Sequence, residues 1–177
     1  AVRLLTRAKV VWHLRDMVKP SREGRWFSWL AGFAPHAVLA NSQAMRDSLS
    51  CSRARRRTRV LANAIALDDY RGGNRERQRQ AWGLGRDDLA ILHVGMFCPL
   101  KGQHVLLEAM PTILSACPQA RAVFVGAEAY VTGDPGFENY AEKLREKAER
   151  LGIGHAVAWA GLCNSMADAY AAGDMLA

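Results

Sequence analysis

The stretch ILHVGMFCPLKGQHVLLEA, residues 91–109, decides the fold. Its first residues form the β-rich apolar run that is typical of a strand covered on both faces. Gly95 ends this strand, Gly102 opens an amphipathic helix, and Lys101 lies on the loop between them. A loop that leads from a parallel strand into a helix N-terminus is a place where α/β proteins bind anions. The stretch therefore predicts a phosphate site at Lys101, with an ordinary turn and a solvated lysine as the alternative.

The second half of the chain continues the alternation between strands and helices. Apolar periodicity predicts helices at about 103–116, 137–151 and 165–172. Strands are predicted at about 89–95, 121–126, 156–160 and from 174 onward. Such an alternation indicates βαβ units, a parallel sheet and right-handed crossovers. Pro111 should kink or break the first of these helices, because proline removes a backbone donor.

The first half predicts a second α/β region. Strands are expected at about 9–13, 36–42 and 59–70, and helices at about 21–33 and from 43. Residues 71–80 (RGGNRERQRQ) are polar, contain two glycines and lack apolar periodicity, which is typical of a linker. The expected division is a domain at 1–70, a hinge at 71–88 and a second domain at 89–177. Both ends read as internal to a longer chain, because residue 1 is not methionine and residues 174–177 open another strand.

The net charge is distributed unevenly. Residues 1–80 contain 17 Lys and Arg against 6 Asp and Glu, whereas residues 81–177 contain 7 against 11. A basic half can attract nucleic acid, anionic lipid or a phosphorylated acceptor. The densest run is RARRRTR at 53–59, for which a solvated surface or loop is the alternative. Trp26 and Trp29 lie beside basic residues, which suits either a membrane headgroup layer or a core beneath the sheet.

Composition excludes several classes of protein. The four cysteines contain no C-x-x-C pair, so a disulfide framework or a zinc site is disfavoured and a reducing cytoplasm is favoured. No run approaches the roughly 18 apolar residues of a membrane span, and no secretory signal opens the chain.

Several segments, in order, resemble one known family. The family 4 retaining glycosyltransferases of GT-B architecture carry V-G-R, a short loop, K-G and then a helix with L-x-x-A. This chain has V-G-M at 94–96, K-G at 101–102 and L-L-E-A at 106–109. The departure is Met96, where the family usually has an arginine that helps the lysine to hold the donor diphosphate. Further similar segments are LANS at 39–42, LANAIALDDY at 61–70, ARAVFVGA at 120–127, residues 140–161 and MADAYAAGDMLA at 166–177.

The resemblance implies a fold and a reaction. The fold would be two Rossmann-like domains with parallel sheets, here the end of the N-terminal domain and most of the C-terminal domain. The reaction would move a sugar from a nucleotide-sugar donor to a glycan or lipid-phosphate acceptor, with retention of anomeric configuration. It would require no metal or other cofactor, in agreement with the absence of a D-x-D motif. Independently of the resemblance, the cysteine usage and the basic first half with its tryptophans predict a cytoplasmic protein that makes peripheral contact at the inner face of an anionic membrane.

The same resemblance assigns roles to individual residues. His13 would face the donor sugar as the catalytic residue from the N-terminal domain. The donor diphosphate would lie against Gly95, Lys101 and Gly102, and the nucleotide against Gly126, Glu128 and Gly161. Arg15 and Asp16 would lie on the acceptor side. The structural alternatives are a hydrogen-bonding role for His13, a surface ion pair between Arg15 and Asp16, and a plain turn at Gly161.

Other functions fit the sequence less well. A nicotinamide-dependent oxidoreductase requires G-x-G-x-x-G, and the spacing of Gly95 and Gly102 does not match it. A nucleic-acid- or anion-binding Rossmann-like module without catalysis would use the basic half, but no recognisable binding motif accompanies it. A catalytically inert paralogue is a third alternative, which Met96 suggests.

Overall fold

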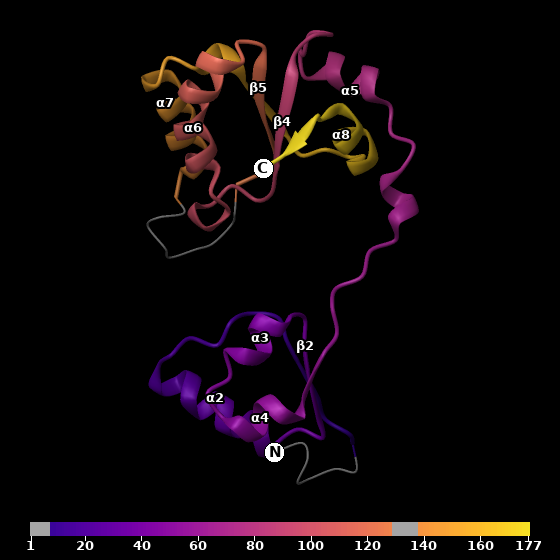
Figure 1. Cartoon of the computed structure of the whole chain (residues 1–177), viewed down its shortest axis with the longest axis vertical. Coiled ribbons are helices and arrows are strands. Elements are labelled where there is room, and N and C mark those ends of the chain that lie inside the picture. Colours follow the sequence, from indigo (N-terminus) through magenta and orange to yellow (C-terminus); the bar gives the residue numbers. More distant parts are fainter. Residues whose placement is uncertain (1–7, 129–137) are drawn as a thin grey trace. The chain divides into compact units, whose positions relative to one another are not determined.

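The computed structural model describes residues 8–128 and 138–177, which form two compact units (Figure 1). Unit 1 is Ala1–Ile65 and unit 2 is Ala66–Ala177. In both units the strands are parallel and alternate with helices, which confirms the predicted α/β class. Within residues 8–128 and 138–177, no helix combines the length and the apolar character needed to cross a bilayer.

Unit 1 is a three-stranded parallel sheet in the order β1-β2-β3, with helices between the strands. The strands are β1 (Val11–Leu14), β2 (Ala37–Ala40) and β3 (Thr58–Val60). The helices are α2 (Arg22–Phe33), α3 (Gln43–Asp47) and α4 (Ser52–Arg57). The third strand is shorter than expected, because the chain leaves the sheet after Val60. The buried core consists of Leu14, Ala31, Val38, Ala40, Met45, Leu49 and Ala54.

Helix α2 packs through small residues and through Phe27, whose ring stacks on Trp12 of β1 at 5.4 Å. Ser21 caps its N-terminus by accepting a hydrogen bond from the Gly24 N–H at 3.1 Å. Its buried positions are Ser28, Ala31 and Gly32, and a Cβ on Gly32 would lie 3.4 Å from the Ala54 nitrogen of α4. The interpretation of the tryptophans as core beneath the sheet is therefore wrong, because Trp26 and Trp29 are exposed.

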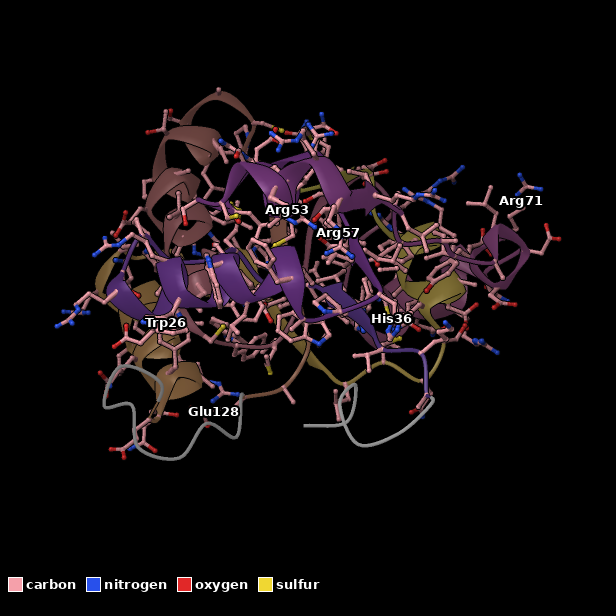
Figure 2. All side chains as sticks on the ribbon, turned by 90° about the horizontal axis from the view of Figure 1, so that it is seen from below. Trp26, His36, Arg53, Arg57, Arg71 and Glu128 are labelled. Atoms are coloured by element: carbon pink, nitrogen blue, oxygen red, sulfur yellow. The ribbon has the colours of Figure 1, made fainter. Side chains whose placement is uncertain are left out.

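The basic run 53–59 is not the loop that its composition allowed. Its first five residues belong to α4, and two of their side chains reach the end of α2 (Figure 2). The Arg53 Nε donates to the Gly32 carbonyl at 3.1 Å, and Arg57 donates to the Pro35 carbonyl at 3.0 Å. These arginines satisfy carbonyls that the helix C-terminus leaves unpaired.

Unit 2 contains a four-stranded parallel sheet in the order β6-β5-β4-β7. The strands are β4 (Leu89–Val94), β5 (Ala120–Val125), β6 (Val157–Gly161) and β7 (Met175–Leu176). The α-helices are α5 (Arg75–Ala81), α6 (Gln103–Ala116), α7 (Tyr140–Arg150) and α8 (Met166–Ala172). Short 3₁₀ helices are η1 (Leu67–Tyr70), η2 (Pro99–Lys101) and η3 (Gly154–Ala156). Apart from α5, these α-helices and strands lie within a few residues of the predicted ones, and Pro111 does not interrupt α6.

Both faces of this sheet are covered. Helices α6 and α7 pack on one face, around a core that includes Leu107, Met110, Phe124 and Leu144. The other face presents Ala90, Leu92, Val123 and Val125, against which Trp82 and Leu84 pack. The continuous apolar runs of β4 and β5 reflect this double burial.

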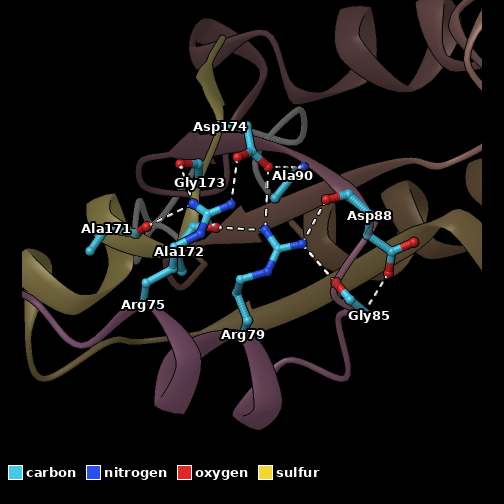
Figure 3. Close-up of polar contacts among 9 residues, drawn as sticks. All are labelled: Arg75, Arg79, Gly85, Asp88, Ala90, Ala171, Ala172, Gly173 and Asp174. Carbon is cyan, nitrogen blue, oxygen red and sulfur yellow. Dashed lines mark hydrogen bonds and ion pairs between the residues drawn. The ribbon is translucent and has the colours of Figure 1, made fainter.

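The segment 71–88, expected to be a linker, contains helix α5, which belongs to unit 2 (Figure 3). Arg79 is buried and donates to the carbonyls of Ala172, Gly85 and Asp88 at 3.0, 2.7 and 2.6 Å. Arg75 pairs with Asp174 at 2.6 Å. An apolar face therefore was not needed to dock α5, because the buried Arg79 and the exposed Arg75 donate to backbone carbonyls instead.

Asp174 completes this polar cluster from the start of β7. Its carboxylate accepts a hydrogen bond from the Ala90 N–H at 2.8 Å and lies 3.3 Å from an Arg79 nitrogen. Burial alone would raise the pKa of Asp174, but the Ala90 N–H and the Arg75 guanidinium outweigh it and hold that pKa below its usual range.

We predict that Arg79→Met destabilises the protein by about 3 kcal/mol, because three backbone carbonyls lose the buried guanidinium that donates to them and Asp174 loses one of its two arginine partners. Urea unfolding of the complete protein measures the change. Arg71→Met is the matched control, since Arg71 and its partner Asp68 are exposed and such pairs contribute under about 1 kcal/mol. Equal loss of stability in both variants would contradict the structural role of Arg79.

Candidate functional site

Three of the predicted glycines lie together at the carboxyl edge of the sheet in unit 2. Gly95 follows β4, Gly126 follows β5, and Gly161 ends β6. The Gly95 N–H donates to the Val125 carbonyl at 2.9 Å, and the Gly126 N–H donates to the Gly161 carbonyl at 2.8 Å. Because the strands are parallel, all three turns open on the side where α/β sheets bind ligands.

Gly126 is required by close backbone contact. Its φ is +149°, and a Cβ at this position would lie 2.0 Å from the Gly95 carbonyl oxygen. The turn after β5 can therefore lie against the turn after β4 only without a side chain. The contact continues beyond the strands, since the Phe97 N–H donates to the Ala127 carbonyl at 2.8 Å.

Lys101 lies where the phosphate loop, residues 95–102, meets helix α6. Its side chain is exposed, and its methylene groups pass 3.9 Å from the position that a Cβ on Gly95 would take. In the part of the chain that the structure describes, its ammonium group has no ion-pair partner. Gly102 takes the left-handed conformation, with φ +77°, and no side chain caps α6. The first-turn N–H groups of α6 and the Lys101 cation thus both lie at the carboxyl end of β4, where an anion would be stabilised.

Two buried polar side chains hold the phosphate loop from inside. The His93 Nε2 lies 2.8 Å from the Lys101 carbonyl, which can only accept, so the proton is on Nε2. The Gln103 Nε2 donates to the Met96 carbonyl at 2.9 Å. Among the described residues, the His93 Nδ1 and the Gln103 Oε1 have no partner. Both residues were missed from sequence, although a histidine inside an apolar strand was a visible signal.

Glu128 makes a structural contact at this edge. Its half-buried carboxylate accepts from the Ala141 N–H at 3.3 Å, near the start of α7. An acidic group at a helix N-terminus is favourable, so the contact itself accounts for a glutamate here. Met96, at the position of the usual arginine, is exposed.

A second missed pair joins α6 to α7. The His104 Nδ1 lies 2.9 Å from the Tyr140 hydroxyl. Burial raises the pKa of Tyr140, so its hydroxyl stays protonated and serves as a hydrogen-bonding group.

The remaining predicted residues lie in unit 1. His13 is exposed on β1 and pairs in register with Leu39 of β2. The Arg15 carbonyl accepts from the Asn41 Nδ2 at 3.3 Å, which joins the loops after β1 and β2. The side chains of Arg15 and Asp16 are exposed, and no ion pair between them occurs in the described part of unit 1. The structure thus groups the predicted residues into two sets, one in each unit.

The described residues contain no cluster of three or more His, Cys, Asp or Glu side chains suited to a metal ion. Cys51, Cys98, Cys117 and Cys163 are all free, as their spacing predicted.

Curated relatives match about half of this chain. A D-inositol 3-phosphate glycosyltransferase 2 of Catenulispora acidiphila is 34% identical over 103 residues, which are 57% of this chain and 23% of that protein. The spore coat protein SA of Bacillus subtilis is 31% identical over 97 residues, or 51% of this chain and 25% of that protein. The chain therefore spans about a quarter of the length of these relatives.

Solved structures match nearly the whole chain. The crystal structure of Anabaena Alr3699/HepE in complex with UDP and glucose superposes with a TM-score of 0.81 at 27% identity, and the match covers 96% of this chain and 46% of that one. A glycosyltransferase from Rickettsia africae has the same fold, with a TM-score of 0.77 at 16% identity over 98% of this chain and 46% of that one. Residues 74–177, more than half of the chain, match the family described as Glycosyl transferases group 1, and the chain belongs to that family.

Proposed function

We propose that the complete protein is a retaining glycosyltransferase that moves a sugar from a nucleotide-sugar donor to a glycan or lipid-linked acceptor. The observation that carries the proposal is the exposed Lys101 beside the uncapped N-terminus of α6, at the carboxyl edge of the sheet. The family assignment supports the reaction class, and the complex of the Anabaena protein with UDP and glucose supports a uridine diphosphate sugar as the first donor to test.

The proposed chemistry breaks the bond between the anomeric carbon and the diphosphate oxygen. A new bond forms between that carbon and the acceptor oxygen, and the acceptor loses a proton. Negative charge grows on the leaving diphosphate, so a fixed cation and helix N–H groups lower the barrier. In this proposal Lys101 and the first turn of α6 supply that charge, and no metal is required.

The other predicted residues take roles around this reaction. Gly95 and Gly102 let the backbone approach the diphosphate, and Gly126, Glu128 and Gly161 line the nucleotide. From unit 1, His13 contacts the donor sugar, and Arg15 and Asp16 contact the acceptor. These assignments rest on the family resemblance together with the exposure of His13, Arg15 and Asp16.

The direct test combines binding and turnover in the complete protein. Calorimetry with UDP should detect binding, and UDP release from a uridine diphosphate sugar should require an acceptor. Nuclear magnetic resonance of the product then distinguishes retention from inversion at the anomeric carbon. Binding of duplex DNA without any nucleotide binding would instead favour the non-catalytic alternative.

We predict that Lys101→Ala weakens UDP binding by about tenfold to a hundredfold, since a charge-assisted contact contributes on the order of 1.5–3 kcal/mol. Calorimetry measures the affinity. Arg150→Ala is the control, because Arg150 is an exposed cation in the last turn of α7. Unchanged affinity in the Lys101 variant would refute the diphosphate site.

We predict that Gln103→Leu weakens UDP binding about twofold to tenfold while the melting temperature changes little. The Met96 carbonyl loses its donor, so the phosphate loop is held less firmly. The same substitution removes the buried Oε1 that has no partner among the described residues, which offsets the lost hydrogen bond in stability. A large drop in melting temperature with unchanged affinity would show a purely structural role.

We predict that Met96→Arg tightens UDP binding, because it restores a second cation beside the phosphate loop. The Met96 side chain is exposed, so an arginine fits without repacking. Met96→Gln is the matched control, with a polar but uncharged side chain. If both variants bind UDP as the parent does, another residue already fills the role of the family's arginine.

A further inference from the structure

Helix α2 carries three exposed aromatic side chains in one continuous row, which we call the aromatic face: Trp26, Trp29 and Phe33. Figure 2 labels Trp26, the first of them. Their exposed fractions are 65%, 51% and 44%. The rings of Trp26 and Trp29 lie 5.6 Å apart, and those of Trp29 and Phe33 lie 5.1 Å apart. The spacing of three and four residues places all three on one side of the helix.

The two tryptophans of the aromatic face do not hold α2 in unit 1. The buried positions of the helix are Ser28, Ala31 and Gly32, which lie on the opposite side of the helical wheel. Ser28 also donates to the Gly24 carbonyl and accepts from the Ser50 N–H. The helix is therefore docked by its small residues and by Phe27, which stacks on Trp12 of β1, whereas Trp26 and Trp29 are more than half exposed. Exposed aromatic groups of this size usually mark an interaction surface.

Positive charge surrounds this face. Arg22 and Arg25 lie one turn before Trp26 and Trp29 on the same side of α2, and both are exposed. Arg25 forms a shallow hollow with the two tryptophans. At the other end of the row, the Arg53 guanidinium lies 4.7 Å from the centre of the Phe33 ring. Unit 1 as a whole contains 13 Lys and Arg against 3 Asp and Glu.

We propose that the aromatic face of α2 docks on the surface of an anionic lipid bilayer. Tryptophans favour the boundary between headgroups and acyl chains, and arginines at the same level meet the lipid phosphates. Each cation near such a surface contributes about 1 kcal/mol, and the effect weakens with salt. A nucleic-acid duplex would use the charge but would leave the row of three neighbouring rings exposed, since its bases are stacked on one another inside the duplex.

The docking surface lies in unit 1 and involves none of the residues of the phosphate loop. Docking and donor binding can therefore be tested separately. If both hold, the enzyme works where lipid-phosphate acceptors are found, which would narrow the proposed acceptor to the lipid-linked class.

The test is co-sedimentation of the complete protein with vesicles of phosphatidylcholine, with and without phosphatidylglycerol. Binding should require the anionic lipid and fall as salt is raised. Tryptophan fluorescence should shift to the blue on binding. Trp26→Ser with Trp29→Ser should lower vesicle affinity by about tenfold or more while UDP binding stays unchanged.

A charge-matched pair of variants locates the surface. Arg22→Glu with Arg25→Glu should lower vesicle affinity by more than about tenfold. Arg55→Glu with Arg56→Glu changes the net charge equally, but these exposed arginines of α4 lie beside Arg46 and Asp47 instead. An equal loss in both variants would reduce the contact to general charge attraction and overturn the proposal. Vesicle binding that survives the tryptophan substitutions would also overturn the proposal. An absence of vesicle binding would overturn it too, and the aromatic face would then pack against other residues of the complete protein.

Discussion

The close approach of the turns after β4 and β5 is the contact on which the site in unit 2 depends. A carbonyl oxygen of Gly95 occupies the space where Gly126 would carry a side chain. This approach lets the hydrogen bonds between the two segments continue past the strands to Phe97 and Ala127. The phosphate loop is therefore anchored at its start by main-chain contacts, and a larger residue at 126 would have to push the two turns apart.

The other side of the phosphate loop is held by side chains. His93 reaches the carbonyl of Lys101 and Gln103 reaches that of Met96, so the loop is tied to buried groups near both of its ends. Fixed groups stabilise a developing charge better than mobile ones, because they require no reorganisation during the reaction. The loop thus carries an exposed lysine, while the buried His93 and Gln103 hold its backbone in place.

Polar burial also explains the largest difference between expectation and structure. Residues 71–80 have no apolar periodicity, which predicts a linker, yet residues 75–81 form α5. The helix docks because Arg79 donates to three carbonyls of unit 2 and Arg75 meets Asp174. Hydrophobic patterning cannot detect such an attachment, since it rests on polar backbone acceptors, one of which, the Ala172 carbonyl, lies 93 residues from Arg79. The same holds for Arg53 and Arg57, which satisfy the carbonyls at the end of α2.

The sequence by itself determined the alternation of strands and helices, the parallel class of the sheets, the turn glycines and the lysine of the phosphate loop. These follow from periodicity and local turn chemistry, which neighbouring residues encode. Only the tertiary structure decided which polar groups are buried and which apolar ones are exposed. His93 and Gln103 became supports of the loop, Glu128 met the first turn of α7, and the tryptophans of α2 turned outward. Each outcome depends on how separate loops, strands and helices pack against one another, and the local sequence pattern does not specify that packing.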